Sequence, residues 1–235
     1  MAGSGSPPRY AAACPVFRPI TVGMDRRMLQ RLIVIVVMVV VSLASDQSAA
    51  QDAIGTISRI QGEASAVRSG ATRALGVSAS VFANEIVSTG EAARLEVTLR
   101  DQTRLTLGER AKLTLDRYVF DPAGRSGTIK FGLVGAFRFV SGQLAKLANA
   151  EVSVTTPVAI VGIRGTEFWG GPIDDQVLGV FLIEGSVSVS NAAGEQILNT
   201  PGQGTNVAAP GAAPGPVTIW AQGKVSRAIA TVTFR

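Results

Sequence analysis

Apolar and polar residues alternate in short runs over most of the chain beyond residue 53. The clearest run, RLEVTL over residues 94–99, has leucine or valine at every second position. A period of two predicts a β-strand with one buried and one exposed face. Asp101-Gln102 is expected to reverse the chain, because the alternation resumes with Leu105 and Leu107.

Other segments show the same texture. Residues 54–60 and 64–68 are expected to form a hairpin, and residues 177–183 and 187–189 a strand pair around the turn at Glu184-Gly185. Two aromatic-rich strands are predicted over residues 129–134 and 136–140. Their phenylalanines are expected to pack in the core, with Arg138 on the opposite face: Phe131, Phe137 and Phe139.

Strands at such close spacing predict an all-β fold: a single domain of many short, mostly antiparallel strands, arranged as a sandwich, a barrel or a β-solenoid. We place this domain at residues 51–207. Residues 208–216, AAPGAAPGP, are expected to be a linker, and residues 217–235 have a near-helical apolar spacing that predicts a short C-terminal helix.

A leader is predicted over residues 24–50. Arg26, Arg27 and Arg31 precede an uncharged apolar run, LIVIVVMVVVSLA, and Ser48-Ala49-Ala50 supplies the small residues of a cleavage site. We expect a signal peptide that is cleaved after Ala50, which makes the product periplasmic or secreted. The alternative is an uncleaved leader that anchors the chain in the inner membrane. Residues 1–23 are expected to be a disordered extension or to precede the true start.

Charge argues against a nucleic-acid partner. The chain has a formal net charge of +5, but five of its 22 basic residues and only two of its 17 acidic residues lie in the first fifty positions. The rest is close to neutral, and its basic residues are scattered singly. Phosphate backbones require a concentrated basic surface.

The residue types also argue against catalysis. The chain has no histidine, and its single cysteine, Cys14, precedes the apolar run. Ser-His-Asp and Cys-His mechanisms, and zinc or iron sites built on histidine, are therefore excluded. We expect no enzyme, no catalytic residue, no cofactor and no bound metal.

The most distinctive stretch is VSVTTPVAIVGIRGTEFW, residues 152–169, which resembles the FecR family. The family pattern has a Thr-Pro, a short apolar strand and an Arg-Gly-Thr-x-Phe element, matched here by Thr156-Pro157, Arg164-Gly165-Thr166 and Phe168. With the strands upstream, the resemblance covers about residues 86–190. It implies a periplasmic β-domain, which in the best-known members senses an outer-membrane siderophore receptor. In the best-known members, the signal passes through a transmembrane helix to a cytoplasmic segment that binds a sigma factor.

The short Pro-rich stretch before the apolar run lacks the amphipathic helical pattern of such a segment. We therefore expect an exported, non-catalytic module of the bacterial envelope, without the cytoplasmic anti-sigma segment. It is expected to act in sensing or regulation by binding an unidentified envelope protein. The alternatives are a structural or scaffolding domain that binds glycan or associates with itself, and a membrane-anchored regulator of transmembrane signalling. Membrane contact is expected only through an uncleaved leader.

Strand alternation places Arg164 on an otherwise apolar face. A guanidinium there requires a carboxylate to offset desolvation, and Glu167 or Glu184 could supply it. We interpret Arg164-Gly165-Thr166 as a structural cluster in which the guanidinium ties neighbouring strands together, with direct ligand contact as the alternative.

A docking loop is predicted immediately after this cluster. Trp169, Asp174 and Asp175 frame a Gly-Gly-Pro stretch, and an aromatic side chain beside flexible and acidic residues is typical of a partner-binding loop.

Overall fold

The computed structural model describes residues 53–121, 123 and 125–235. Gln51–Arg235 forms one compact unit. The expected leader and the extension before it lie outside the described residues. Within the described part of the chain, no helix combines the length and the apolar character needed to cross a membrane.

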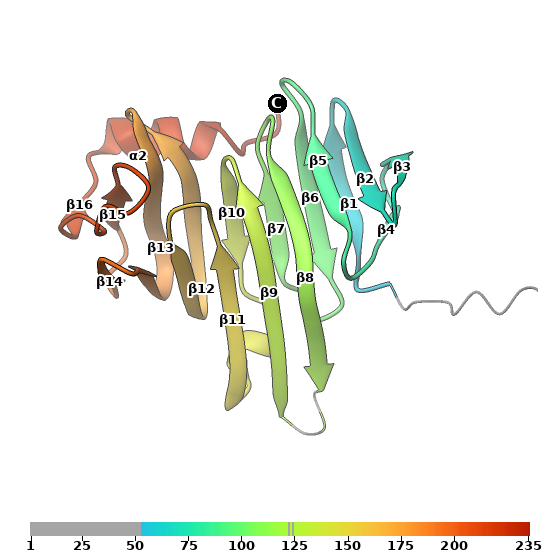
Figure 1. The fold of residues 1–235 in the computed structure, drawn as a ribbon, viewed down its shortest axis with the longest axis horizontal. Coiled ribbons are helices and arrows are strands. Elements are labelled where there is room, and N and C mark those ends of the chain that lie inside the picture. The colour runs from blue at the N-terminus through green and yellow to red at the C-terminus, as the bar shows by residue number, and fades with distance from the viewer. Residues whose placement is uncertain (1–52, 122, 124) are drawn as a thin grey trace, which may run out of the picture. The chain divides into compact units, whose positions relative to one another are not determined.

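Sixteen strands, one 3-10 helix and one α-helix make up the described part (Figure 1). In chain order they are β1 (Gly55–Gln61), β2 (Ala64–Arg68), β3 (Ala71–Ala74), β4 (Ser80–Val81), β5 (Ile86–Thr89), β6 (Arg94–Leu99), β7 (Arg104–Leu107), β8 (Lys112–Asp121), β9 (Ser126–Val134), β10 (Phe137–Val140), η1 (Leu144–Lys146), β11 (Asn149–Thr155), β12 (Ile160–Ile173), β13 (Gln176–Asn191), β14 (Gly194–Leu198), β15 (Gln203–Val207), β16 (Thr218–Ile219) and α2 (Gln222–Ala230).

All the strands belong to one hydrogen-bonded sheet. Its main path runs β3-β2-β5-β8-β9-β11-β12-β10-β7-β6-β1-β4, and β13 to β16 continue from β12. Every described strand pair is antiparallel except β9 with β11. The prediction of an all-β, mostly antiparallel fold with a short C-terminal helix is confirmed.

Strand β12 joins the two halves of this sheet. Its residues 160–162 pair with β11 and its residues 167–170 pair with β10. Because β13 lies along its other edge over nearly its whole length, β10 and β11 must share one edge of β12. The run β11-β9-β8 therefore leaves the first part of β12, and the run β10-β7-β6 leaves the second.

The two runs pack against each other over a common core. Phe131 of β9 and Phe139 of β10 are not on paired strands, yet their ring centroids lie 6.3 Å apart in an edge-on arrangement. Figure 1 shows β11, β9 and β8 overlying β10, β7 and β6. Phe131, Phe137 and Phe139 are all at most 1% exposed. Their predicted place in the core is confirmed, as is the outward direction of Arg138.

Two predicted hairpins are wrong. Strands β1 and β2 exist, but β1 pairs with β4 and β6, whereas β2 pairs with β3 and β5. Gly62, at φ +72°, turns the chain between them, where a Cβ atom would lie 3.1 Å from Ala93. The second correction concerns residues 176–191, which form one long strand, β13. Gly185, which suggested a turn, instead marks a bend within that strand.

The C-terminal part of the chain packs on the domain. Residues 208–216, the expected linker, accept hydrogen bonds from Asn191 Nδ2 to Ala212 O (2.7 Å) and from Thr205 Oγ1 to Gly215 O (2.6 Å). Helix α2 follows and lies against β12, with Ala228 fully buried. A small second core forms there around Trp169, Phe181 and Trp220.

A buried carboxylate, Asp101, connects the β6–β7 turn to η1. It accepts hydrogen bonds from Thr103 N–H (3.2 Å), Thr103 Oγ1 (2.8 Å) and Leu144 N–H (3.2 Å). Its own N–H donates to Tyr118 Oη over 3.0 Å. Burial, together with the nearby Asp101 charge, raises the pKa of Tyr118 above its ordinary value. The predicted chain reversal at Asp101-Gln102 therefore also positions the first turn of η1.

Replacing this carboxylate should weaken the domain. Asp101→Ala leaves three buried hydrogen-bond donors without an acceptor. It is expected to lower the free energy of unfolding by about 3 kcal/mol. Urea unfolding followed by circular dichroism measures the loss. Asp116→Ala, which removes an exposed carboxylate from β8, is the matched control and should change the stability by less than about 0.5 kcal/mol. Equal effects of the two substitutions would contradict the role given to Asp101.

Candidate functional site

The β12–β13 pair bends where β12 passes from one run of strands to the other. The register between the two strands shifts between Arg164 and Glu167. Gly165 has φ +54° and Gly185 has φ +84°, both in the left-handed region that favours glycine. A Cβ atom on Gly185 would lie 2.3 Å from the carbonyl oxygen of Gly165. The bend thus requires the two backbones to approach more closely than any side chain at position 185 allows.

Thr166, whose side chain is buried, stabilises the bend through hydrogen bonds. Its hydroxyl donates a hydrogen bond to Glu184 O on β13. Its N–H donates to Ser141 Oγ (2.9 Å), and its carbonyl oxygen accepts from Ser141 N–H (2.9 Å), just beyond β10. Thr166 is 4% exposed. The strands are therefore tied together by the threonine of the Arg-Gly-Thr element, in the role that the sequence suggested for Arg164.

The other residues of the expected family pattern lie on either side of this bend. Thr156 and Pro157 form the connection between β11 and β12, where Thr156 Oγ1 accepts from Ala159 N–H (3.0 Å) and donates to Ala159 O (2.8 Å). Phe168 is fully buried between Phe137 and Phe139, with ring centroids 5.7 and 5.6 Å away. The pattern thus describes a hairpin turn, a bend and a core aromatic along one strand.

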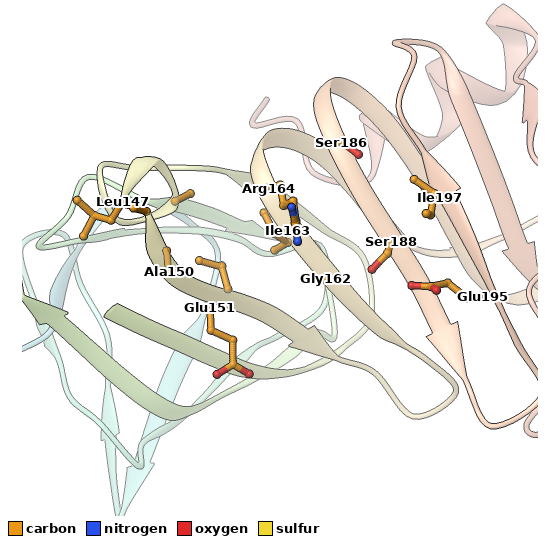
Figure 2. Close-up of a pocket in the computed structure, with 13 residues that line it drawn as sticks. Leu147, Ala150, Glu151, Gly162, Ile163, Arg164, Ser186, Ser188, Glu195 and Ile197 are labelled. Carbon is orange, nitrogen blue, oxygen red and sulfur yellow. The ribbon is translucent and has the colours of Figure 1, made fainter. Parts of the chain in front are cut away.

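A cleft opens beside the bend, where β11 and β12 separate. Their last paired residues are Ser153 and Gly162. From there β11 stays with β9 down to its first residue, while β12 stays with β13. Figure 2 shows the two strands diverging, with Ala150 on one side and Arg164 on the other. The cleft has a volume of about 730 Å³, within the range of ligand-binding pockets.

Small side chains form the floor of the cleft. Gly162 lies opposite Ser188, and Arg164 opposite Ser186, in the β12–β13 ladder. These residues belong to the outer face, because the alternate residues Val187 and Val189 are buried. Ile197 of β14, 58% exposed, neighbours Ser188 on the far side. Leu147, after η1, lines the opposite side.

The expected ion pair of Arg164 is corrected. Arg164 is exposed and lines the cleft, and it makes no ion pair or side-chain hydrogen bond within the described part of the chain. Glu167 instead binds Arg138 on the outer face, and Glu184 is exposed. The alternation itself holds, because Ile160, Gly162 and Arg164 share one face of β12. That face is the outer one, with Ile160 48% exposed, so the guanidinium needs no buried partner.

Two carboxylates also line the cleft. Glu151 forms an ion pair with Lys130, in which Lys130 Nζ lies 2.6 Å from Glu151 Oε1. Glu195 of β14 is exposed and has no ion-pair partner among the described residues. The cleft therefore carries one positive and one negative side chain that remain available, and they come from different strands.

The predicted docking loop is only partly a loop. Trp169 is fully buried, and its Nε1 donates to Thr231 Oγ1 over 3.0 Å. Strand β12 continues past it because Gly170 leaves room for Phe137, whose ring would lie 2.5 Å from a Cβ atom at position 170. Trp169 as an exposed docking residue is therefore corrected. Asp174 and Asp175, at φ +50° and +60°, form the exposed turn between β12 and β13.

Asp174 is engaged by helix α2. Its Oδ1 accepts from Arg227 over 2.7 Å, and its Oδ2 lies 3.4 Å from Lys224 Nζ. The hydrogen bond from Arg227 holds the pKa of Asp174 below its ordinary value of 3.8. This contact favours the docked helix above pH 3.8, and the preference fades only as the pH falls through the lower pKa of the folded state. Partner binding by the Asp174-Asp175 turn stays a prediction.

The cleft itself was missed at the sequence level. One signal was present: Ser186, Ser188 and Ser190 alternate with buried valines, which indicates a strand face lined by small hydroxyls. The position of Glu195 opposite Ser190 depends on the β13–β14 register. Among the described residues, no group of three or more histidine, cysteine or acidic residues is placed to hold a metal ion.

The bend supplies a prediction with an internal control. In Gly185→Ala, the alanine would have to adopt a left-handed backbone conformation, and its Cβ atom would clash with the carbonyl oxygen of Gly165. The substitution is expected to lower the free energy of unfolding by about 3 kcal/mol or more. Gly70→Ala has nearly the same φ, +82°, but open space around it, so it should cost only about 1 kcal/mol. Urea unfolding of the two variants measures the difference. Equal losses would show that the close approach at Gly185 is not needed.

Comparison with known proteins assigns part of the chain to a family. The model of the family described as FecR protein matches residues 85–188. Two crystal structures of a candidate anti-sigma factor from Parabacteroides distasonis match with 19% identity and a TM-score of 0.48, over 60% of this chain and 62% of that one. The chain thus spans less than two thirds of that protein. A comparison with curated proteins gives no match. Residues 85–188, with the bend and most of the cleft, form a FecR domain.

Proposed function

We propose that this chain is an exported, non-catalytic regulatory module of the bacterial envelope that acts by binding another protein. The observation that carries the proposal is the FecR domain at residues 85–188, a domain of regulatory signalling proteins. The leader expected at residues 24–50 supports export, with the domain on the periplasmic side.

The chemistry of the chain is consistent with binding. The sequence has no histidine, and the available charged residues in the cleft, Arg164 and Glu195, lie on different strands. Because the cleft has a small-residue floor and an open mouth, it suits a ligand that lies along it. A regulatory module needs such a surface, since it must change its contacts when the signal changes.

Fractionation tests the export part of this proposal. Cells that express the full chain with a C-terminal tag should yield a periplasmic product whose N-terminus is Gln51. A membrane-bound product that retains residues 32–44 would instead indicate an anchored regulator.

Transcript profiles test the regulatory part. Deleting the gene from the cells that encode it should change a defined set of transcripts, and the full chain should restore them. A chain without residues 24–50 should fail to restore them if the module acts outside the cytoplasm. Gly185→Ala should also fail if the folded FecR domain is required, whereas Gly70→Ala is the matched control that should restore. Altered envelope integrity with unchanged transcripts would contradict regulation and favour a structural role.

A further inference from the structure

We propose that the cleft between β11 and β12 binds an extended peptide segment of a protein partner. The segment adds as a strand to the free edge of β11, with an acidic side chain facing Arg164 and a basic side chain facing Glu195. This inference rests on the proposed function of the chain as a protein-binding module, and specifies the binding site and the kind of ligand.

The backbone is the first argument. Thr156 N–H donates to Ala159 O, so hydrogen-bonded pairs in the β11–β12 hairpin recur at every second position. Val154 and Val161 form such a pair, and the ladder ends just beyond them, at Ser153 and Gly162. The N–H of Val152 and the N–H and C=O of Ala150 have the same orientation as those of Val154 and lie beyond this end. They therefore point into the cleft, where the edge of β11 is open to an added strand. Strand addition to an exposed edge is a common mode of peptide recognition.

The charges are the second argument. Arg164 lies opposite Ser186, and Glu195 lies opposite Ser190. These two serines are four positions apart on β13, which corresponds to about 13 Å along the strand. In an extended peptide, residues i and i+4 point the same way and are also about 13 Å apart. Arg164 and Glu195 lie on the strands to either side of β13, so they are also about 10 Å apart across the sheet, a distance that long acidic and basic side chains of the peptide have to span. The cleft thus suits a segment with an acidic residue and, four positions away, a basic one.

The floor is the third argument. At Gly162 the backbone has no positive φ, so other residues can adopt its conformation, and a Cβ atom there would meet only Ser188 Oγ, at 2.8 Å. A larger residue at this position should suit the strand and fill the cleft. Gly162→Val is therefore expected to block the site while leaving the domain folded, with thermal unfolding as the check.

Selection from a displayed library of random twelve-residue linear peptides tests the proposal. The bait is the chain as expressing cells process it. Enriched peptides should carry an acidic and a basic residue four positions apart. Their affinity should fall about tenfold or more with Arg164→Glu and with Glu195→Lys, because each change opposes like charges. Peptides with the acidic residue replaced by lysine should regain binding to Arg164→Glu.

Arg104→Glu is the matched control, since Arg104 is an exposed arginine of β7 that does not line the cleft. It should leave peptide affinity unchanged. The proposal is overturned if no peptide is enriched. It is also overturned if the enriched peptides bind wild type and a folded Gly162→Val variant equally, or if Arg104→Glu weakens binding as much as Arg164→Glu.

A cell experiment separates this proposal from the proposed function. A chain with Arg164→Glu should fail to restore the transcripts that wild type restores. If it restores them fully, the cleft is not the regulatory site and this inference is overturned, although the regulatory function stands. If wild type itself restores nothing, the proposed function fails.

Discussion

The close approach of two backbones, Gly165 on β12 and Gly185 on β13, is the constraint on which the rest of the domain depends. Without a bend at this point, β12 could serve only one run of strands. With the bend, its first part pairs with β11 and its second part with β10. One strand therefore belongs to both runs of strands that enclose the core. Thr166 fixes the bend through hydrogen bonds to residues of two different segments.

The same bend explains why a core and a cleft lie side by side. Residues of β12 beyond the bend, such as Phe168, enter the aromatic core. The residues between Ile163 and the bend are carried away from β11 and leave the edge of its first residues open. Arg164 is at the transition and reaches solvent in the cleft. The bend of the β12–β13 pair is therefore also what opens the edge of β11.

Local patterns predicted local structure well. Alternation over residues 94–99 predicted β6, and the near-helical spacing of the last residues predicted α2. Pairing was harder, because it depends on register and on distant partners: β1 and β2 are neighbours in sequence but join different strands. Gly185 predicts a turn at the end of a strand, since a single sequence does not distinguish a turn glycine from a bend glycine. Trp169 was misplaced for a related reason, because its neighbouring glycines accommodate core side chains.

The residues of the cleft were the least predictable. Arg164 was singled out, but its expected ion pair was wrong, because the strand face that it shares with Ile160 and Gly162 is exposed and not buried. Glu195 comes from a separate hairpin and carries no distinguishing pattern of its own. What the family pattern marks is mostly the scaffold: a turn, a bend and a core phenylalanine. The surface that such a scaffold presents depends on how the strands separate beside it.

Hydrogen exchange at four backbone amides tests this account most directly. Val152, Val154, Val161 and Ile163 all have side chains that are at most 7% exposed, so side-chain burial does not distinguish them. If β11 and β12 separate as described, the amides of Val154, Val161 and Ile163, which belong to the ladder, should exchange slowly and the amide of Val152, which lies beyond its end, much faster. Equal protection of all four would mean that the strands stay paired and that the open edge does not exist.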